Sequence, residues 1–337
     1  MGRLVKACMG EEVDRTPVWF MRQAGRYLPG YREVRRNHSV LEIIRNPQLA
    51  AKVASEPVLN FGFDGAIIFS DIILPLTTMG VKLELEEGVG PVIREPFRRG
   101  EDVDRLTPGR VEELGFVYEQ IRLLRERFQD VSVIGFAGAP FTLASYLVEG
   151  KYSRGFELTK SYMYRHTEAW KRLMGKLTET VIAYLKHQVR YGVEVLQLFD
   201  SWVGALSPKD YAEYVKPFVQ EIFAEVTGVP RIYFGTSTTG LLGEFSDLDF
   251  EVLGVDWRVS IGLAWKIIGK KSVQGNLDPA TLLGSREIAI RRTREILLEV
   301  SNRPGHIFNL GHGVLPQTDP AIVKAVVDYV HIMTERG

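Results

Sequence analysis

Five arginines gather in one short segment of the chain. The segment 22–36, RQAGRYLPGYREVRR, holds a single acidic residue, Glu33, so its local charge is five minus one, or plus four; its arginines are Arg22, Arg26, Arg32, Arg35 and Arg36. The planar fork of an arginine side chain matches a carboxylate or a phosphate with two parallel hydrogen bonds. We therefore predict a polyanionic ligand here. The alternative is a solvated basic run near the end of a helix.

Three polar side chains follow apolar runs and could take part in chemistry. Asp71 comes directly after GAIIFS, and its alternative role is a strand-end cap or an ion-pair partner of Arg22. Tyr146 follows the turn after VSVIGF, and Ser201 follows VEVLQLF. Their alternatives are a phenol that packs a helix and a hydroxyl that caps a loop.

His312 is a further candidate because it stands between Gly311 and Gly313 in NLGHG. Glycines without side chains let the backbone approach a ligand, although a lone histidine is more often structural. The chain has six histidines and none forms a close pair at the spacing of metal ligands. We expect no metal and no organic cofactor, since the dinucleotide motif G-x-G-x-x-G and the zinc motif H-E-x-x-H are both absent from the sequence.

Composition narrows the class of protein. The 337 residues carry 42 Lys and Arg and 42 Asp and Glu, a net charge of zero, which argues against a nucleic-acid binder or a clamp on an anionic membrane. The one cysteine, Cys8, cannot form an internal disulfide and fits a reducing cytoplasm. The start of the chain lacks a signal-peptide pattern, and the uncharged run 131–148 is broken by glycines and Pro140, so we expect neither export nor a membrane span.

The positions of these residues depend on the elements around them. Eight short apolar runs alternate with helical patterns; the runs are 17–21, 65–69, 131–136, 193–199, 231–234, 252–257, 272–277 and 306–310. Alternating strands and helices predict parallel strands joined by crossovers, and eight units favour a single α/β domain over 1–337 with a (β/α)8 barrel, or TIM barrel, fold. A doubly wound sheet is the alternative. The stretch 83–93 predicts a β-hairpin inserted after the second strand.

Six motifs of the chain, in order, resemble those of the uroporphyrinogen decarboxylase family. PVWFMRQAGRYLPGYREVR resembles the N-terminal signature of the family and GFAGAPFTLASYLVEG its second signature, and the other four motifs are FSDIILP, LQLFDSWVG, VQGNLDP and NLGHGVLP. The resemblance covers nearly the whole chain. It departs at Arg258, where a threonine is usual in the family, and in the segment 234–242, which varies between family branches.

This resemblance implies a (β/α)8 barrel, usually a homodimer, that removes four acetate carboxyl groups from uroporphyrinogen III without a metal or organic cofactor. It implies substrate binding by Arg22, Gln23, Arg26, Arg35, Asp71, Tyr146, Ser201 and His312. Catalytic roles fall to Asp71, Arg22 and Tyr146. The proton donor stays open among Arg22, Tyr146, His312 and water, because an arginine with a pKa above 12 is a weak acid.

Two rival functions have a weaker basis. A zinc-dependent methyltransferase of the same superfamily needs a set of His and Cys ligands, which Cys8 alone does not provide. A non-catalytic tetrapyrrole carrier would show degraded motifs, whereas all motif positions are intact.

Overall fold

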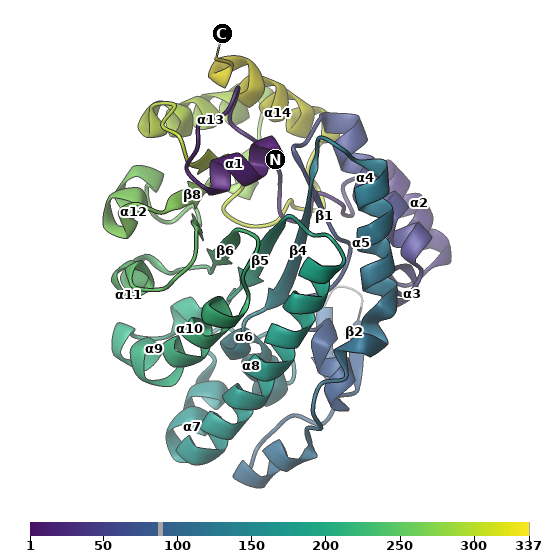
Figure 1. Cartoon of the computed structure of the whole chain (residues 1–337), viewed down its shortest axis with the longest axis vertical. Helices are drawn as coiled ribbons and strands as arrows, with labels where there is room; N and C mark the ends of the chain where they lie inside the picture. Colours follow the sequence, from purple (N-terminus) through teal and green to yellow (C-terminus); the bar gives the residue numbers. More distant parts are fainter. Residues whose placement is uncertain (87–89, 337) are drawn as a thin grey trace.

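The core of the structure, a computed structural model that describes residues 1–86 and 90–336, is a curled sheet of parallel strands with helices around it (Figure 1). Seven strands of the described residues pair in the order β1-β4-β5-β6-β7-β8-β9. They are β1 (Gly65–Ile67), β4 (Ser132–Gly138), β5 (Val195–Phe199), β6 (Arg231–Phe234), β7 (Val252–Gly254), β8 (Ser272–Gln274) and β9 (His306–Ile307). Parallel strands covered by crossover helices are buried on both faces, which explains their nearly continuous apolar runs.

The α-helices of the described residues connect these strands and cover the sheet. They are α1 (Arg3–Cys8), α2 (Pro29–Asn37), α3 (Val40–Arg45), α4 (Pro47–Phe61), α5 (Gly115–Arg127), α6 (Pro140–Glu149), α7 (Glu157–Arg165), α8 (Thr167–Arg190), α9 (Pro208–Tyr214), α10 (Lys216–Glu225), α11 (Leu242–Ser246), α12 (Ile261–Ile268), α13 (Arg286–Val300) and α14 (Pro320–Thr334). Short 3-10 helices cover Leu74–Met79, Gly100–Arg105, Val111–Leu114, Val203–Ala205, Thr239–Leu241 and Pro279–Leu283.

Helix starts follow local chemistry. Asn46, Ser207, Asp278 and Asp319 each precede a proline, and each side chain accepts a hydrogen bond from a backbone N–H of the helix that follows. Proline fits the first helical position because its missing N–H has no intrahelical partner there. In α8 the residues at spacings of three and four, from Trp170 to Gln188, are buried as the pattern predicts.

The first predicted strand, 17–21, is not a strand in the structure. Only Val18 forms a bridge, with Phe308. The Trp19 N–H donates to Phe308 O (3.3 Å) on one side, and the Asp64 N–H donates to Val18 O (2.8 Å) on the other. Pro17 has no N–H to donate, and the chain turns after Phe20, so the segment is too short to form a regular ladder. The expected eight strands are therefore seven in the sheet, with an irregular segment between β9 and β1.

The stretch predicted as a hairpin contains two short strands. β2 (Leu83–Glu86) pairs antiparallel with β3 (Gly90–Ile93), with Leu83 opposite Ile93. Residues 87–89, which join them, lie outside the described residues. This two-stranded sheet is separate from the large one and follows β1 in the chain.

A chain of buried amides crosses the inside of the curled sheet. The indole N–H of Trp19 donates to Gln274 Oε1 (2.9 Å), and Gln274 Nε2 donates to Gln197 Oε1 (2.9 Å). Gln197 Nε2 in turn contacts the sulfur of Met21 (3.4 Å). Because each buried polar group has a partner, these bonds hold the 17–21 segment against β5 and β8 without the penalty of an unsatisfied group.

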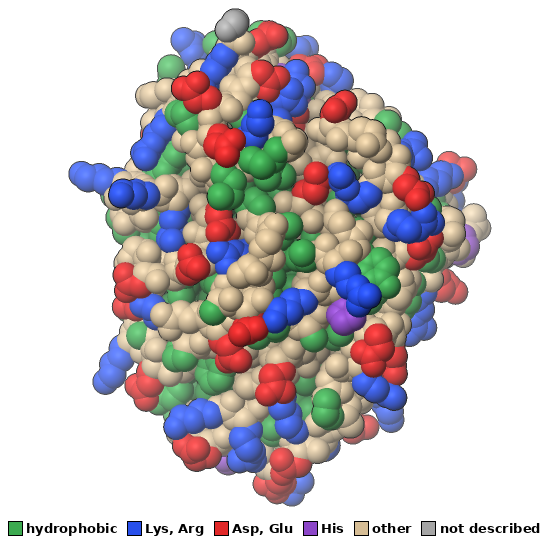
Figure 2. All heavy atoms as spheres, viewed as in Figure 1, with side chains coloured by type: hydrophobic (Ala, Val, Ile, Leu, Met, Phe, Trp, Pro, Cys, Tyr) green, Lys and Arg blue, Asp and Glu red, His purple; other side chains and the backbone are tan. Residues whose placement is uncertain are grey.

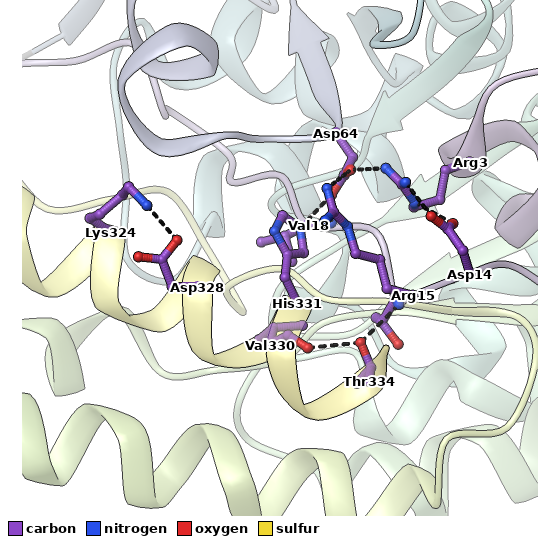
Figure 3. A network of polar contacts seen from close by, with 11 residues as sticks. Arg3, Asp14, Arg15, Val18, Asp64, Lys324, Asp328, Val330, His331 and Thr334 are labelled. Atoms are coloured by element: carbon purple, nitrogen blue, oxygen red, sulfur yellow. Dashed lines mark hydrogen bonds and ion pairs between the residues drawn. The ribbon is translucent and has the colours of Figure 1, made fainter. Parts of the chain in front are cut away.

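Near the amino ends of the strands, Asp64 connects α1 at the start of the chain to α14 at its end (Figure 3). Its Oδ1 pairs with Arg3 Nη1 of α1 (2.6 Å), and its Oδ2 accepts from the Val18 N–H (2.8 Å) and contacts His331 Nε2 of α14 (2.7 Å). Arg3 also forms a two-bond pair with Asp14. Burial raises the pKa of Asp64, but His331, the Val18 N–H and Arg3 together outweigh it, so the pKa lies below its usual value.

The surface is mixed in charge, in agreement with the zero net charge. Figure 2 shows Lys and Arg side chains interspersed with Asp and Glu over one face. Among the helices of the described residues, none combines the length and the apolar character needed to span a bilayer.

We predict that Asp64→Asn lowers the free energy of unfolding by about 3 kcal/mol at neutral pH, because it leaves Arg3 and His331 facing a neutral amide. The folded pKa of Asp64 is lowered, so its stabilisation is present above the unfolded pKa of about 3.9 and is lost as the pH falls through the folded value. The variant should therefore lose less stability than the parent below about pH 4. Denaturant unfolding across pH measures both effects.

The matched control is Asp328→Asn. This change removes an exposed ion pair with Lys324 on α14, the helix that carries His331, and should lower the free energy of unfolding by less than about 1 kcal/mol. Equal costs for the two variants would show that Asp64 is not the junction described above.

Candidate active site

The register of the sheet brings the carboxyl ends of its strands to one level. Gly138 lies opposite Phe199, Phe199 opposite Phe234, and Phe234 opposite Gly254, and the line continues to β8 and β9. Residues that follow these positions emerge at the same end of the sheet. Active sites of barrels and open α/β sheets lie at this end, because the loops there vary without disturbing the strands.

Arg22 is presented by a tight turn. Its φ of 58° lies in the left-handed region, which a residue with a side chain occupies at a cost of about 1–3 kcal/mol. The turn is held by the Gln23 N–H donating to Phe20 O (3.0 Å), and by the Val314 N–H donating to Met21 O (2.9 Å). Within the described part of the chain, the Arg22 guanidinium has no hydrogen bond or ion pair. The strained turn therefore holds the backbone of Arg22 while its guanidinium is free to bind a ligand.

Two glycines explain how His312 lies beside Arg22. A Cβ on Gly313 would come within 2.4 Å of Arg22 Cδ, and a Cβ on Gly311 would come within 2.5 Å of the backbone nitrogen of Trp257. Both glycines thus admit other parts of the protein, rather than a ligand as the sequence suggested. His312 lies between these two contacts, and its Nδ1 accepts from the Gly313 N–H (2.6 Å), which leaves the proton on Nε2.

Asp71 is half-buried just beyond β1. Its Oδ1 accepts from the Ile73 N–H (3.1 Å), so one oxygen serves as the cap that was the alternative role of Asp71. No ion pair with Arg22 within 4 Å exists among the described residues, but the Arg22 charge acts on it. Burial raises the pKa of Asp71, and the Ile73 N–H and Arg22 oppose this only in part.

Tyr146 lies on α6, buried, with its ring 4.1 Å from that of Trp202. Burial and the Asp71 charge raise the pKa of Tyr146, while Arg22 lowers it, so the phenol keeps its proton at neutral pH. Ser201 precedes Trp202 and is half-buried; its backbone oxygen accepts from Thr236 Oγ1 (2.5 Å).

One cation acts on three of the predicted residues. Arg22 affects the pKa of Asp71, of Tyr146 and of His312. Burial, Arg22 and Arg258 lower the pKa of His312 to about 4, against a smaller opposing effect of Asp256. His312 is therefore neutral at physiological pH and can donate through Nε2. The structure thus brings Arg22, Asp71, Tyr146 and His312 together.

The other predicted residues lie differently. Burial raises the pKa of Tyr31, and the charges of Arg35 and Arg26 oppose this rise, so both arginines lie near Tyr31. The Tyr31 ring is 5.7 Å from that of Phe69, which follows β1. Arg35 also donates to His38 O. Gln23 is fully buried, with Oε1 accepting from the Phe20 N–H (3.0 Å) and Nε2 donating to Gly65 O (2.9 Å). Its amide groups hold the Arg22 turn.

Sequence reasoning missed the pair formed by Asp256 and Arg258. Asp256 is 1% exposed, and its Oδ2 lies 2.6 Å from Arg258 Nη1. The sequence signal is a charged pair, DWR, at the end of the sixth predicted run, and the structure adds its closeness to His312. Trp202, the ring neighbour of Tyr146, was also missed.

A cavity of about 860 Å³ lies at the other end of the sheet. It is lined in part by Asp64, Asp130 and Val131, which precede β1 and β4. None of its lining residues is a predicted site residue, and two of its carboxylates, Asp14 and Asp64, form ion pairs with Arg3. We therefore place the candidate site at the carboxyl end of the strands. In residues 1–86 and 90–336, no group of three or more His, Cys, Asp or Glu side chains could hold a metal ion.

Comparison with known proteins gives a consistent result. Residues 1–333 match the family described as uroporphyrinogen decarboxylase (URO-D). The chain belongs to the uroporphyrinogen decarboxylase family. Proteins named uroporphyrinogen decarboxylase from Sorangium cellulosum and Streptomyces coelicolor are 50% and 48% identical to it, over 98% of this chain and 95% and 94% of theirs. One from Geobacillus kaustophilus is 45% identical, over 98% of this chain and 96% of its own.

Solved structures extend the likeness of fold. A methyltransferase from Methanosarcina mazei superposes with a TM-score of 0.79 at 23% identity and covers 98% of both chains. At this identity the likeness concerns the fold alone. The assignment to a family of decarboxylases rests on the family match and the closer relatives.

For this uroporphyrinogen decarboxylase family member, we predict that Arg22→Lys lowers turnover more than tenfold. Lysine keeps the charge but loses the two-bond fork, and a misplaced cation costs more than the roughly 1.4 kcal/mol of one decade. Arg36→Lys, at an exposed position of α2, should keep near-normal turnover. Steady-state kinetics of both proteins would contradict this placement of the arginines if Arg22→Lys were normal or Arg36→Lys severely impaired.

Proposed function

We propose that the protein removes the four acetate carboxyl groups of uroporphyrinogen III, releasing four CO2 and coproporphyrinogen III, without a metal or organic cofactor. The observation that carries this proposal is the meeting of Arg22, Asp71, Tyr146 and His312 at one end of the sheet. The names of the relatives support the substrate.

The proposal includes the setting of the site. We infer one domain over 1–337, in which the 17–21 segment completes a (β/α)8 barrel between β9 and β1; the hydrogen bonds of Val18 and Trp19 to both sides support this closure. The family resemblance supports a homodimer. The single cysteine supports a cytoplasmic location.

The substrate explains why cations must surround one anion. Uroporphyrinogen carries eight carboxylates around four pyrroles, whose N–H groups can converge on a centre. Asp71 would accept those N–H groups, with one oxygen still free of the Ile73 N–H. Arg22 would orient the reacting acetate, and Arg26 and Arg35 would bind other carboxylates. Ser201 contributes a further hydroxyl.

Decarboxylation needs an electron sink for the electron pair of the C–C bond that breaks. Protonation of a pyrrole carbon gives a cation that takes the electron pair left when the C–C bond to CO2 breaks, so the substrate replaces a cofactor. A proton then adds to the methylene carbon and the ring carbon gives up the proton it had gained, so the pyrrole is restored and each acetate arm becomes a methyl group with net uptake of one proton. The Asp71 carboxylate would stabilise the cation electrostatically.

The protonation states narrow the choice of proton donor. With a pKa of about 4, His312 is not an imidazolium at neutral pH, so it acts as a neutral N–H donor that orients a carboxylate. Tyr146 keeps its proton, since burial and Asp71 raise its pKa. Arg22, Tyr146 and a water held by them are the remaining donors.

We predict that the purified protein converts uroporphyrinogen III to the four-carboxylate product, and that exhaustive dialysis against a strong chelator leaves turnover unchanged. The reaction relies on the substrate pyrrole as its electron sink. Chromatographic separation of eight- to four-carboxylate porphyrins measures the products. If the chelated protein were inactive and zinc restored it, the cofactor-free reaction would be wrong.

We predict that Asp71→Asn loses more turnover than Asp71→Glu. Asparagine keeps the size but directs two donor hydrogens at pyrrole N–H groups that can only donate. Glutamate keeps the charge and shifts the macrocycle by one methylene. Turnover and thermal melting of both variants give the answer, and an asparagine variant with normal melting and normal turnover would reduce Asp71 to the cap of the Ile73 N–H.

A further inference from the structure

Hydrogen bonds join the loops after four successive strands into a rim. Thr236, after β6, donates through Oγ1 to Ser201 O, after β5 (2.5 Å). The Ser237 N–H donates to Asp256 Oδ2, after β7 (2.6 Å), and Asn276 Nδ2, after β8, donates to Asp256 O (2.9 Å). Asp256, almost fully buried, is therefore the fixed point of this rim.

Arg258 is held rigidly on that rim. Its backbone N–H donates to Asp256 Oδ1 (3.1 Å), and its Nη1 donates to Asp256 Oδ2 (2.6 Å). Its guanidinium also lies 4.1 Å from the centre of the Trp257 ring. The side chain is nevertheless 45% exposed, and Nε and Nη2 have no hydrogen-bond partner in the described part of the chain. A clamped guanidinium with one open edge loses little entropy when it binds a carboxylate.

The open edge lies next to the candidate site but not at its centre. Trp257 packs against Gly311, and Arg22 packs against Gly313, so His312 stands between the two arginines. The charge of Arg22 acts on Asp71, Tyr146 and His312, whereas among these residues the charge of Arg258 acts on His312 alone. Arg258 therefore follows the residue that packs on the Gly311 side of His312, whereas Arg22 packs on the Gly313 side.

We propose that Arg258 binds a propionate carboxylate of the tetrapyrrole, an arm that does not react, and so determines affinity rather than the rate of decarboxylation. This inference rests on the function proposed above. In each of four rounds a different acetate must reach Arg22, and acetates already processed are methyl groups. The propionates alone keep their carboxylates through every round. A cation at the rim that assists all four rounds must therefore bind those arms.

The test compares Arg258→Gln with the parent in steady-state kinetics. We expect KM for uroporphyrinogen III to rise about tenfold, as for the loss of a charge-assisted hydrogen bond, with kcat within about twofold. The inhibition constant of the four-carboxylate product, coproporphyrinogen III, should rise by the same factor, because that product keeps its propionates. Arg258→Lys should raise KM about threefold, since one ammonium cannot serve Asp256 and the ligand equally well.

Arg303→Gln is the matched control. Arg303 also lies over a tryptophan ring, Trp265, at 4.3 Å, but it precedes β9 and so lies at the other end of the strands. Its KM and kcat should be normal. A normal KM in Arg258→Gln, a loss confined to kcat, or an unchanged product inhibition constant would each overturn the inference.

Two safeguards keep the test decisive. If Arg258→Gln does not fold, Arg258→Lys replaces it, and a normal KM in that variant overturns the inference. If the parent protein does not decarboxylate uroporphyrinogen III, the proposed function fails, whereas an active parent with an unaffected Arg258 variant refutes only the role of Arg258.

Discussion

The site depends on one buried amide, the side chain of Gln23. Its Oε1 accepts from the Phe20 N–H and its Nε2 donates to Gly65 O, so it ties the Arg22 turn to the first residue of β1. Arg22 occupies a left-handed backbone conformation that costs free energy, and only surrounding bonds can hold it there. Because Asp71 follows β1, the same amide sets the position of the main cation relative to the central anion. Gln23 is thus needed to hold the Arg22 turn, although it is fully buried.

The electrostatics of the site follow from this placement. Arg22 is exposed and has no ion pair among the described residues, although the chain carries equal numbers of acidic and basic residues. Burial raises the pKa of Tyr146 and lowers that of His312, so the phenol and the imidazole are both neutral at physiological pH. Burial also raises the pKa of Asp71, and the Ile73 N–H and Arg22 oppose this rise. Asp200, fully buried at the end of β5, follows the same rule: burial raises its pKa to about 6, and hydrogen bonds from Tyr233 and Thr142 limit the increase. The site therefore offers one cation and neutral O–H and N–H donors beside the Asp71 carboxyl group, which suits a substrate with eight carboxylates around four pyrrole N–H groups.

The spacing of apolar residues and the positions of capping residues predict the elements that depend on local sequence. The capping residues Asn46 and Asp319 begin helices, and the apolar runs from 65–69 to 306–310 coincide with the strands of the large sheet, although β4 continues beyond its run to Gly138. The composition of segment 17–21 predicts a strand, but whether a short apolar run forms a ladder depends on its neighbours and on the turn that follows. Likewise, Arg22, Asp71, Tyr146 and His312 could be named from motifs. That Gly311 and Gly313 admit Trp257 and Arg22 depends on contacts between distant segments, which spacing in the sequence does not encode.

Stability and binding are separated along the strands. At the amino ends, Asp64 is saturated by Arg3, His331 and the Val18 N–H, so the charges there hold α1, β1 and α14 together and are not available to a ligand. At the carboxyl ends, Asp256 fixes the loops, yet it leaves one edge of Arg258 open, and Gln23 fixes a turn whose Arg22 has no partner in the described residues. Carboxylates and arginines lie at both ends of the strands. The two ends differ in whether the protein itself supplies a partner for every hydrogen-bond donor. The left-handed turn that presents Arg22 costs free energy in the free protein, and a polyanionic substrate that binds the open donors of Arg22 and Arg258 would recover that cost.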